Sequence, residues 1–291
     1  MTRPAPRAPN FRGPIRCRNR ALNWRCCWCG SGRRTAQGHL DHGGRWIEAT
    51  DWPLPEARPL TLYPQPDMGL APVAPPEGEV LSYDFDPRDP VPTIGGALTS
   101  GEPVFTGGGF DQTEAEQFFG CRHPGMPLIA RPDILSFQTP PLPEALAIIG
   151  PVTVRLRVST DAPDTDFTAK LVDVHPPSAD YPRGYAPILS DGIFRLRYRK
   201  GWDRPEPVGP DEGAVEITIR PFATANLFAK GHRLRLDISS SNFPKFDINP
   251  NTGAPEGTSR QTRIARNSLH PGPGTRLELM VLPVASGSVS R

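Results

Sequence analysis

The segment GPVTVRLRVST, residues 150–160, decides the fold class, because apolar and polar side chains alternate along it without interruption. The residues at even positions from Val152 to Val158 are apolar, and those between them are threonine or arginine. Successive side chains of an extended chain point to opposite faces, so this segment presents one apolar and one polar face. The pattern is typical of a half-buried strand in an antiparallel sheet.

The same alternation recurs from residue 80 towards the C-terminal end. It predicts eight strands in all: 80–85, 133–138, 150–160, 166–174, 194–199, 214–220, 233–240 and 275–282. The 291 residues also include 38 prolines and 28 glycines, which end helices and favour turns. Short strands joined by such turns predict an all-β protein. We expect a jelly-roll (galactose-binding-like) β-sandwich with an irregular N-terminal tail.

The first 45 residues differ from the rest of the chain. They hold ten arginines, four of the five cysteines and a single acidic residue, Asp41, and they show no hydrophobic period. Three interpretations are open: a zinc site of Cys26, Cys29, His39 and His42, an arginine-rich arm that binds nucleic acid, or a disordered or non-native tail. The spacings between these cysteines and histidines are shorter than in the usual zinc finger. We therefore favour the tail.

The body of the chain gives no sign of an oxidising compartment or of a membrane. Cys121 is its single cysteine, so no disulfide framework is expected. No apolar run approaches the roughly 20 residues that span a bilayer, and no signal-peptide pattern opens the chain. Acidic residues balance the arginines of the predicted strands. We therefore expect a cytoplasmic protein with neither a membrane nor a nucleic-acid partner.

Residues 231–246, GHRLRLDISSSNFPKF, contain another alternating strand, which ends in three serines. Leu234, Leu236 and Ile238 should point into the core, and the charged residues between them should face solvent. A hydrolase serine needs a base and oxyanion donors, commonly at a G-x-S-x-G turn. No serine in the chain has glycine both two residues before and two residues after it. We therefore expect Ser239–Ser241 to bond nearby backbone groups and not to act as nucleophiles.

Two pairs of aspartate and histidine lie close together in the sequence. Asp41 and His42 are adjacent, and His175 follows Asp173 by two residues. Neither pair is accompanied by a serine elbow, so neither predicts a catalytic triad. We interpret His175 as a polar residue at the end of a strand, and we expect no catalytic, cofactor-binding or metal-binding residue in the chain.

Several motifs resemble the C-terminal domain of the cocaine-esterase (CocE/NonD) and X-Pro dipeptidyl-peptidase family of serine hydrolases. The strongest is GHRLRLDISSSNFPKFDINPNTG, which begins at Gly231. The others, in the order of the family, are TDWPLP (50–55), FDPRDPVPTIGG (85–96), DTDFTAKLVDVHP (164–176) and DGIFRLRYRKGW (191–202). The likeness is continuous from about Trp46 to Val284. It implies the same β-sandwich that the alternation predicts.

The resemblance does not extend to the catalytic half of the family, an α/β-hydrolase domain that carries the Ser-Asp-His triad. Only 49 residues precede Thr50, too few for such a domain, and no position matches a triad residue. The resemblance therefore implies a truncated hydrolase that is inactive alone and whose partner is an α/β-hydrolase domain, with no cofactor. The choice among ester, acyl amide and X-Pro peptide substrates stays open. A non-enzymatic β-sandwich that binds a protein partner or a carbohydrate is the alternative.

In relatives this domain packs on the hydrolase domain and helps to close the substrate cleft. The loop GGALTSGEPVFTGGGFDQ, residues 95–112, is the expected contact, through the apolar residues Leu98, Val104, Phe105 and Phe110. A plain surface loop is the alternative interpretation. An uncovered docking face would also allow the chain to associate with itself.

The composition and the motifs together divide the chain into four parts. We expect a basic tail over 1–45, a lead-in segment over 46–77, the jelly-roll domain over 78–285 and a short tail over 286–291.

Overall fold

The structure is a computed structural model that describes residues 24–28, 33–34, 36–41, 45–95, 109–209 and 211–282. Of residues 24–28, 33–34, 40–41 and 45–48 it describes the backbone alone. Within these ranges the regular structure consists of strands and two short 3-10 helices, η1 (Leu128–Ala130) and η2 (Leu196–Tyr198). The strands are β1 (Trp24–Trp28), β2 (Arg33–Arg34), β3 (Leu40–Asp41), β4 (Arg45–Ala49), β5 (Arg58–Pro64), β6 (Leu70–Ala71), β7 (Leu81–Phe85), β8 (Leu135–Gln138), β9 (Leu146–Gly150), β10 (Thr153–Thr160), β11 (Asp166–Val174), β12 (Ile188–Arg195), β13 (Val215–Ile219), β14 (Thr224–Phe228), β15 (Arg233–Ser239), β16 (Ala265–Leu269) and β17 (Arg276–Leu282).

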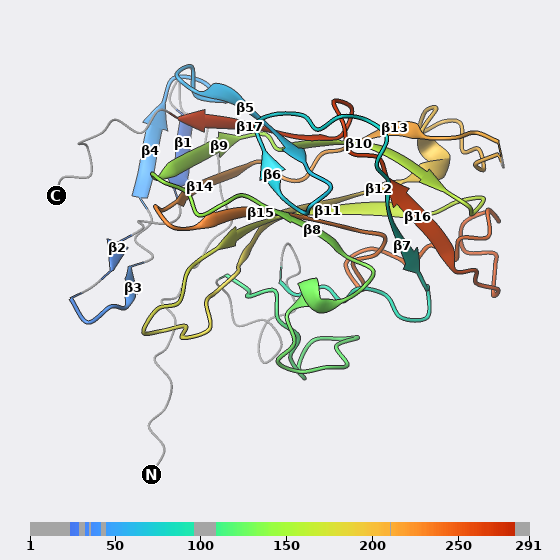
Figure 1. Ribbon diagram of the computed structural model, residues 1–291, viewed down its shortest axis with the longest axis horizontal. Helices are drawn as coiled ribbons and strands as arrows, with labels where there is room; N and C mark the ends of the chain where they lie inside the picture. The colour runs from blue at the N-terminus through green and yellow to red at the C-terminus, as the bar shows by residue number, and fades with distance from the viewer. Residues whose placement is uncertain are drawn as a thin grey trace, which may run out of the picture.

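Two antiparallel sheets form the body of the protein, one above the other in Figure 1. The larger has nine strands in the order β14-β9-β17-β10-β16-β7, with β13 paired to β10, β5 to β17 and β6 to β5. The smaller has four strands in the order β12-β11-β15-β8. The predicted all-β sandwich is confirmed.

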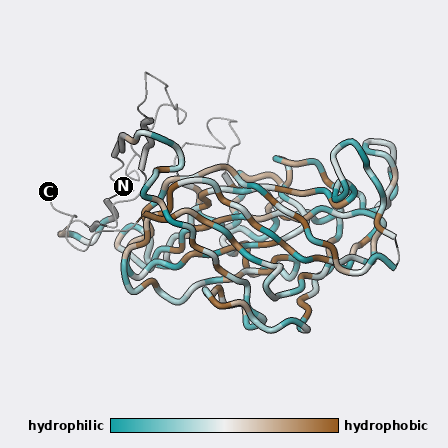
Figure 2. The backbone as a smooth tube through the Cα atoms, turned by 90° about the horizontal axis from the view of Figure 1, so that it is seen from above, coloured by the Kyte–Doolittle hydropathy of each residue, from teal (hydrophilic) through white to brown (hydrophobic). Residues whose placement is uncertain are grey.

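The core lies between the two sheets and is built by the alternation that the sequence shows. Figure 2 shows hydrophobic and hydrophilic residues succeeding one another along the strands. On β15 the side chains of Leu234, Leu236 and Ile238 are fully buried, as predicted, and so are the apolar side chains of β10. Burying a leucine or isoleucine side chain contributes roughly 1.5–3 kcal/mol, so the register of these strands is strongly fixed.

The strand predicted at 194–199 is wrong in its bounds. The structure has β12 over Ile188–Arg195, followed by the 3-10 helix η2. The reason is the buried carboxylate of Asp164, which accepts a hydrogen bond from the Arg197 backbone N–H at 2.9 Å and another from Arg197 Nε at 2.7 Å. Arg197 therefore points inward to Asp164, although the alternation predicts that it faces solvent.

Short strands are also present in the N-terminal region, where we expected no regular structure. β1 pairs antiparallel with β4, and β2 pairs with β3. The pairing of these strands is made by backbone hydrogen bonds, which leave no mark on the hydrophobic pattern of the sequence. β5, in the segment that we interpreted as a lead-in, pairs with β17 of the larger sheet.

None of the helices in the described part of the chain is long and apolar enough to cross a membrane.

Candidate functional site

The serine run lies where β15 ends, and its hydroxyl groups tie separate parts of the fold together. Ser239 Oγ forms a hydrogen bond with Thr168 Oγ1 at 2.6 Å. Ser240 Oγ forms one with Tyr83 OH at 2.8 Å and accepts another from Asn267 Nδ2 at 2.7 Å. Ser241 Oγ accepts a hydrogen bond from the backbone N–H of Val91 at 2.8 Å. Ser240 thus bridges the two sheets, because Tyr83 lies on β7 and Ser240 directly follows β15. Burial raises the pKa of Tyr83 far above its usual value, so this bridge stays uncharged.

A serine and a histidine do meet elsewhere, on the larger sheet. Ser159 Oγ lies 2.8 Å from His270 Nε2. Burial and the nearby Arg157 lower the pKa of His270, so the imidazole is neutral at pH 7. Within the described ranges, no carboxylate forms a hydrogen bond or ion pair with His270. The pair therefore lacks the acid that orients the base of a hydrolase triad.

The outer face of the four-stranded sheet is polar but buried, contrary to the prediction that it faces solvent. Arg235 and Asp237 of β15 are almost fully buried, and Lys170 of β11 lies opposite Asp237. Asp237 accepts hydrogen bonds from Arg235 Nε at 3.1 Å and from Ser136 Oγ at 2.7 Å. Alternation correctly separates the two faces of β15, but it does not tell whether another segment covers the polar one.

The neighbouring strand β12 continues this polar layer. Asp191 pairs with Lys245 and accepts a hydrogen bond from Asn242 Nδ2 at 2.7 Å. Lys170 lies opposite Asp191 in the register, yet its Nζ atom is buried without a hydrogen-bond partner among the described residues. Burial lowers the pKa of Lys170 to about 8, although the attraction of Asp191 and Asp237 opposes this. Lys170 is thus a buried amine that is easier to deprotonate than a lysine in water.

A covering layer, defined as residues 88–95 and 109–134, packs outside the four-stranded sheet. Figure 1 shows its later part, with η1, below β8 and β11. Its backbone is held by hydrogen bonds to Phe243 after β15 and to Ile188 at the start of β12. It has a small core of its own, formed by Val91, Ile94, Phe118 and Leu128.

The loop predicted to contact a hydrolase domain runs into this layer. Phe110 packs against its small core, with its ring 6.0 Å from that of Phe118 in a T-shaped arrangement. A Cβ atom at Gly95, where φ is +75°, would lie 2.5 Å from the Phe110 side chain, so glycine is required there. Leu98, Val104 and Phe105 lie outside the described residues.

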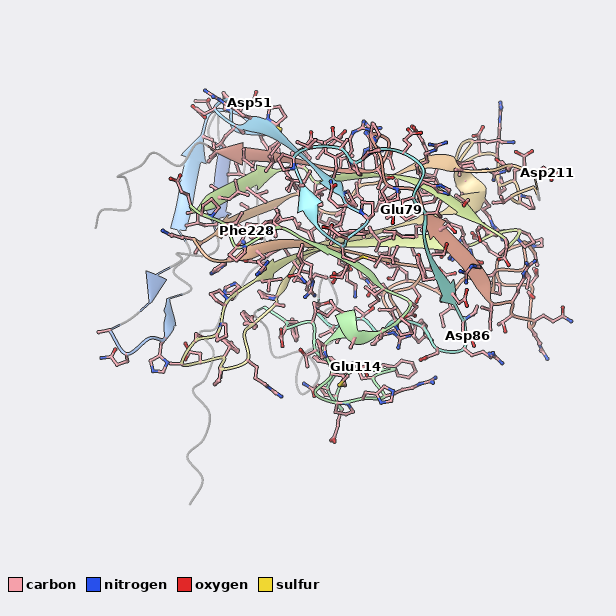
Figure 3. The ribbon with its side chains drawn as sticks, viewed as in Figure 1. Asp51, Glu79, Asp86, Glu114, Asp211 and Phe228 are labelled. Atoms are coloured by element: carbon pink, nitrogen blue, oxygen red, sulfur yellow. The ribbon has the colours of Figure 1, made fainter. Side chains whose placement is uncertain are left out.

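A depression of about 360 Å³ opens in the covering layer and is rich in acidic residues. Asp86, after β7, and Glu114, before η1, are labelled in Figure 3 on this side of the molecule. Glu114 is buried and accepts hydrogen bonds from the backbone N–H groups of Arg122 and His123. Asp86 accepts from the Arg88 side chain, which lowers the pKa of its carboxyl group. The carboxylates of Asp86 and Glu114 are therefore held by groups of the protein itself.

The DTDF motif at 164–167 supplies two buried carboxylates that hold arginines. Asp166 forms a bidentate ion pair with Arg195, in which both N–O distances are 2.9 Å. Asp164 forms an ion pair with Arg197. Asn249 donates to both carboxylates, at 2.9 Å and 2.8 Å. The motif thus fixes the end of β12 and the segment after β15.

His175 has a more specific environment than a polar residue at the end of a strand. Its Nε2 atom lies 3.3 Å from Asp173 Oδ2, while His232 Nδ1 lies 2.8 Å from Asp173 Oδ1. Asn226 on β14 donates to Asp173 Oδ2 at 2.9 Å. The two imidazole rings lie 4.0 Å apart, centre to centre. Sequence reasoning noticed Asp173 and His175 but missed His232, which strand pairing brings to them.

Known proteins resemble most of this chain. The family described as the X-Pro dipeptidyl-peptidase C-terminal non-catalytic domain matches residues 33–278. Cocaine esterase of Rhodococcus sp. (strain MB1 Bresler) is 37% identical over 240 residues, which are 78% of this chain and 38% of the esterase. An aminopeptidase from a marine sediment archaeon, Thaumarchaeota archaeon, superposes with a TM-score of 0.65 at 30% identity, over 82% of this chain and 39% of its own. An α-amino acid ester hydrolase gives the same TM-score and coverage at 26% identity.

The chain spans less than two-fifths of the length of each of these three relatives. The chain therefore belongs to the X-Pro dipeptidyl-peptidase C-terminal non-catalytic domain family, and its resemblance to the C-terminal domain of the cocaine-esterase (CocE/NonD) hydrolases is confirmed.

Proposed function

We propose that this chain serves as the C-terminal domain of a serine hydrolase of the acyl-esterase or X-Pro dipeptidyl-peptidase type, and that it performs no hydrolysis by itself. It packs on an α/β-hydrolase domain and covers the substrate cleft. The observation that carries the proposal is the match of residues 33–278 to a domain described as non-catalytic. The contacts of Ser239–Ser241 support it, because all three hydroxyl groups have structural partners.

The covering layer is the face proposed to meet the hydrolase domain. It leaves three large apolar side chains in solvent: Phe119 is 67% exposed, Met126 48% and Ile129 37%. Met126 also lines the depression in this layer. Exposed apolar side chains near a hollow are typical of a protein interaction surface. Together these features favour a partner that presents complementary apolar side chains.

The loop 95–112 completes this proposed contact. Phe110, at the described end of the loop, is anchored in the small core of the covering layer. We propose that Leu98, Val104 and Phe105 extend from there to the rim of the substrate cleft. In a chain without its hydrolase partner, the same apolar face would support self-association.

The division of the chain follows from the same proposal. Residues 78–285 form the domain that docks, the lead-in at 46–77 joins it to whatever precedes it, and residues 1–45 and 286–291 lie outside the functional unit. β5 shows that the lead-in also contributes a strand to the larger sheet.

A reconstitution experiment tests the proposal. The purified chain is mixed with the isolated α/β-hydrolase domain of the Rhodococcus cocaine esterase. Complex formation is followed by analytical ultracentrifugation, and turnover by hydrolysis of p-nitrophenyl butyrate and of a Gly-Pro anilide. We expect a 1:1 complex in which kcat/KM of the hydrolase domain rises at least tenfold, a barrier decrease of about 1.4 kcal/mol.

Variants locate the contact. Phe119→Ser and Ile129→Ser should each weaken the complex, because a serine hydroxyl would face the apolar surface of the partner. Trp202→Ser is the matched control, since Trp202 is 72% exposed but lies after η2, outside the covering layer. Absence of a complex at micromolar concentrations, or equal weakening by all three substitutions, would contradict the proposed docking face.

A further inference from the structure

Two histidines and an aspartate meet at the point where β11 ends and β15 begins. The register pairs Val174 with Arg233, so His175 and His232 lie opposite one another on adjacent antiparallel segments. Asp173 of β11 contacts both imidazoles. The ligand atoms of the three side chains all lie within 4.8 Å of one another.

This cluster is enclosed and held in place before any ligand arrives. The exposed fractions of the side chains are 4% for Asp173, 12% for His175 and 7% for His232. Asn226, from the other sheet, fixes the carboxylate through its hydrogen bond to Oδ2. The Tyr185 ring packs edge-on against His175 with the ring centres 5.3 Å apart. Little side-chain freedom is left to lose on binding, which favours tight coordination.

The donor atoms of the cluster suit a cation. Asp173 supplies a carboxylate, and each of the two histidines supplies one imidazole nitrogen. The atoms that face one another are His175 Nε2, His232 Nδ1 and the two carboxylate oxygens of Asp173. Each can donate a lone pair to one ion placed among them.

We propose that Asp173, His175 and His232 bind one divalent transition-metal ion of the zinc class. Two imidazoles with one carboxylate suit Zn²⁺, Co²⁺ and Ni²⁺, whereas Ca²⁺ and Mg²⁺ prefer oxygen ligands throughout. Metal–nitrogen and metal–oxygen bonds of about 2.0–2.2 Å require the three side chains to close slightly around the ion.

The site joins elements that are far apart in the sequence. The bound ion would link the ends of β11 and β15 to Asn226 on the opposite sheet and stabilise this end of the sandwich.

The test is isothermal titration of the full chain with ZnCl₂ after dialysis against EDTA. Cys26, Cys27 and Cys29 are replaced by serine throughout, because these thiols could bind zinc independently. In this background we expect one Zn²⁺ per chain and a Tm that rises with the logarithm of the free zinc concentration. CoCl₂ then serves as a spectroscopic probe of nitrogen and oxygen coordination.

Three variants decide the assignment. His175→Phe keeps an aromatic ring beside Tyr185 and removes the ligand nitrogen, and His232→Gln removes the other imidazole. Each should reduce zinc affinity at least tenfold. His270→Ala, a histidine outside the cluster, should bind zinc as the parent does. If His232→Gln fails to fold, His175→Phe decides alone. Absence of saturable binding in the folded parent, or an unchanged affinity of His175→Phe, would overturn the proposal.

Discussion

Replacing Lys170 with methionine should stabilise the protein at neutral pH. The Lys170 amine is buried without a hydrogen-bond partner among the described residues, and burial lowers its pKa from 10.5 to about 8. A difference of this size corresponds to about 3 kcal/mol against the charged form in the folded protein. Methionine has a similar length and carries no charge, so it removes this cost. The attraction of Asp191 and Asp237 is lost with the charge, but Lys245 and Arg235 still pair with these carboxylates.

The expected gain in the free energy of unfolding is about 1–3 kcal/mol at pH 7. Its pH dependence has a definite sign. Between about pH 8 and pH 10.5 the folded protein has released the Lys170 proton, whereas the unfolded chain still binds it. The wild-type protein therefore gains stability from this group as the pH rises through that window, and the advantage of the variant shrinks.

Urea denaturation followed by tryptophan fluorescence at pH 7, 8, 9 and 10 measures this effect. Lys230→Met is the matched control, because Lys230 is exposed, and it should change stability by less than about 0.5 kcal/mol. A Lys170→Met variant that is less stable than the wild type at pH 7 would refute the reasoning. A gain that stays constant from pH 7 to pH 10 would refute it equally.

Three further substitutions test other parts of the fold. Arg197→Met leaves the buried Asp164 carboxylate without its cation and should reduce the free energy of unfolding by about 3–5 kcal/mol, measured by urea denaturation. Ser240→Ala removes the hydroxyl bridge between the sheets and should cost about 1–3 kcal/mol in the same assay, with no change in hydrolysis by a reconstituted complex. Gly95→Ala forces the Phe110 side chain to move and strains a backbone with positive φ, so it should weaken docking of a hydrolase domain while the far-UV circular dichroism of the sandwich is retained. A Gly95→Ala variant that docks with full affinity would show that the anchored end of loop 95–112 does not matter for the contact.

The strands could be predicted because alternation reports directly on one buried face. β10 and β15 show this, since their apolar residues face the core in the structure as expected. The burial of the polar face of β15 could not be predicted. The residue types and their alternation are the same whether a polar face is covered by another segment or exposed to solvent. The period-two pattern at 194–199 was misleading for a similar reason, since Arg197 is drawn inward by Asp164, 33 positions away.

Predicting the cluster of Asp173, His175 and His232 would have required knowing which strands are neighbours in the sheet. Asp173 and His175 are two residues apart in the sequence, but His232 is 57 residues further on. The signal that could have revealed it is the position of the two histidines, one just after a predicted strand and the other just before one. An antiparallel pairing of those two strands places the histidines opposite one another.

The most direct test of the proposed function is hydrolysis by the purified chain without any partner. Turnover of p-nitrophenyl butyrate and of a Gly-Pro anilide is measured while a covalent serine probe reports on activated nucleophiles. The account predicts turnover equal to the buffer background and no labelled serine, because an activated nucleophile, its base and its oxyanion donors must come from the hydrolase domain. The account would be contradicted by turnover above background together with stoichiometric labelling of one serine. Ser159, which lies beside His270, is the first serine to examine for the label.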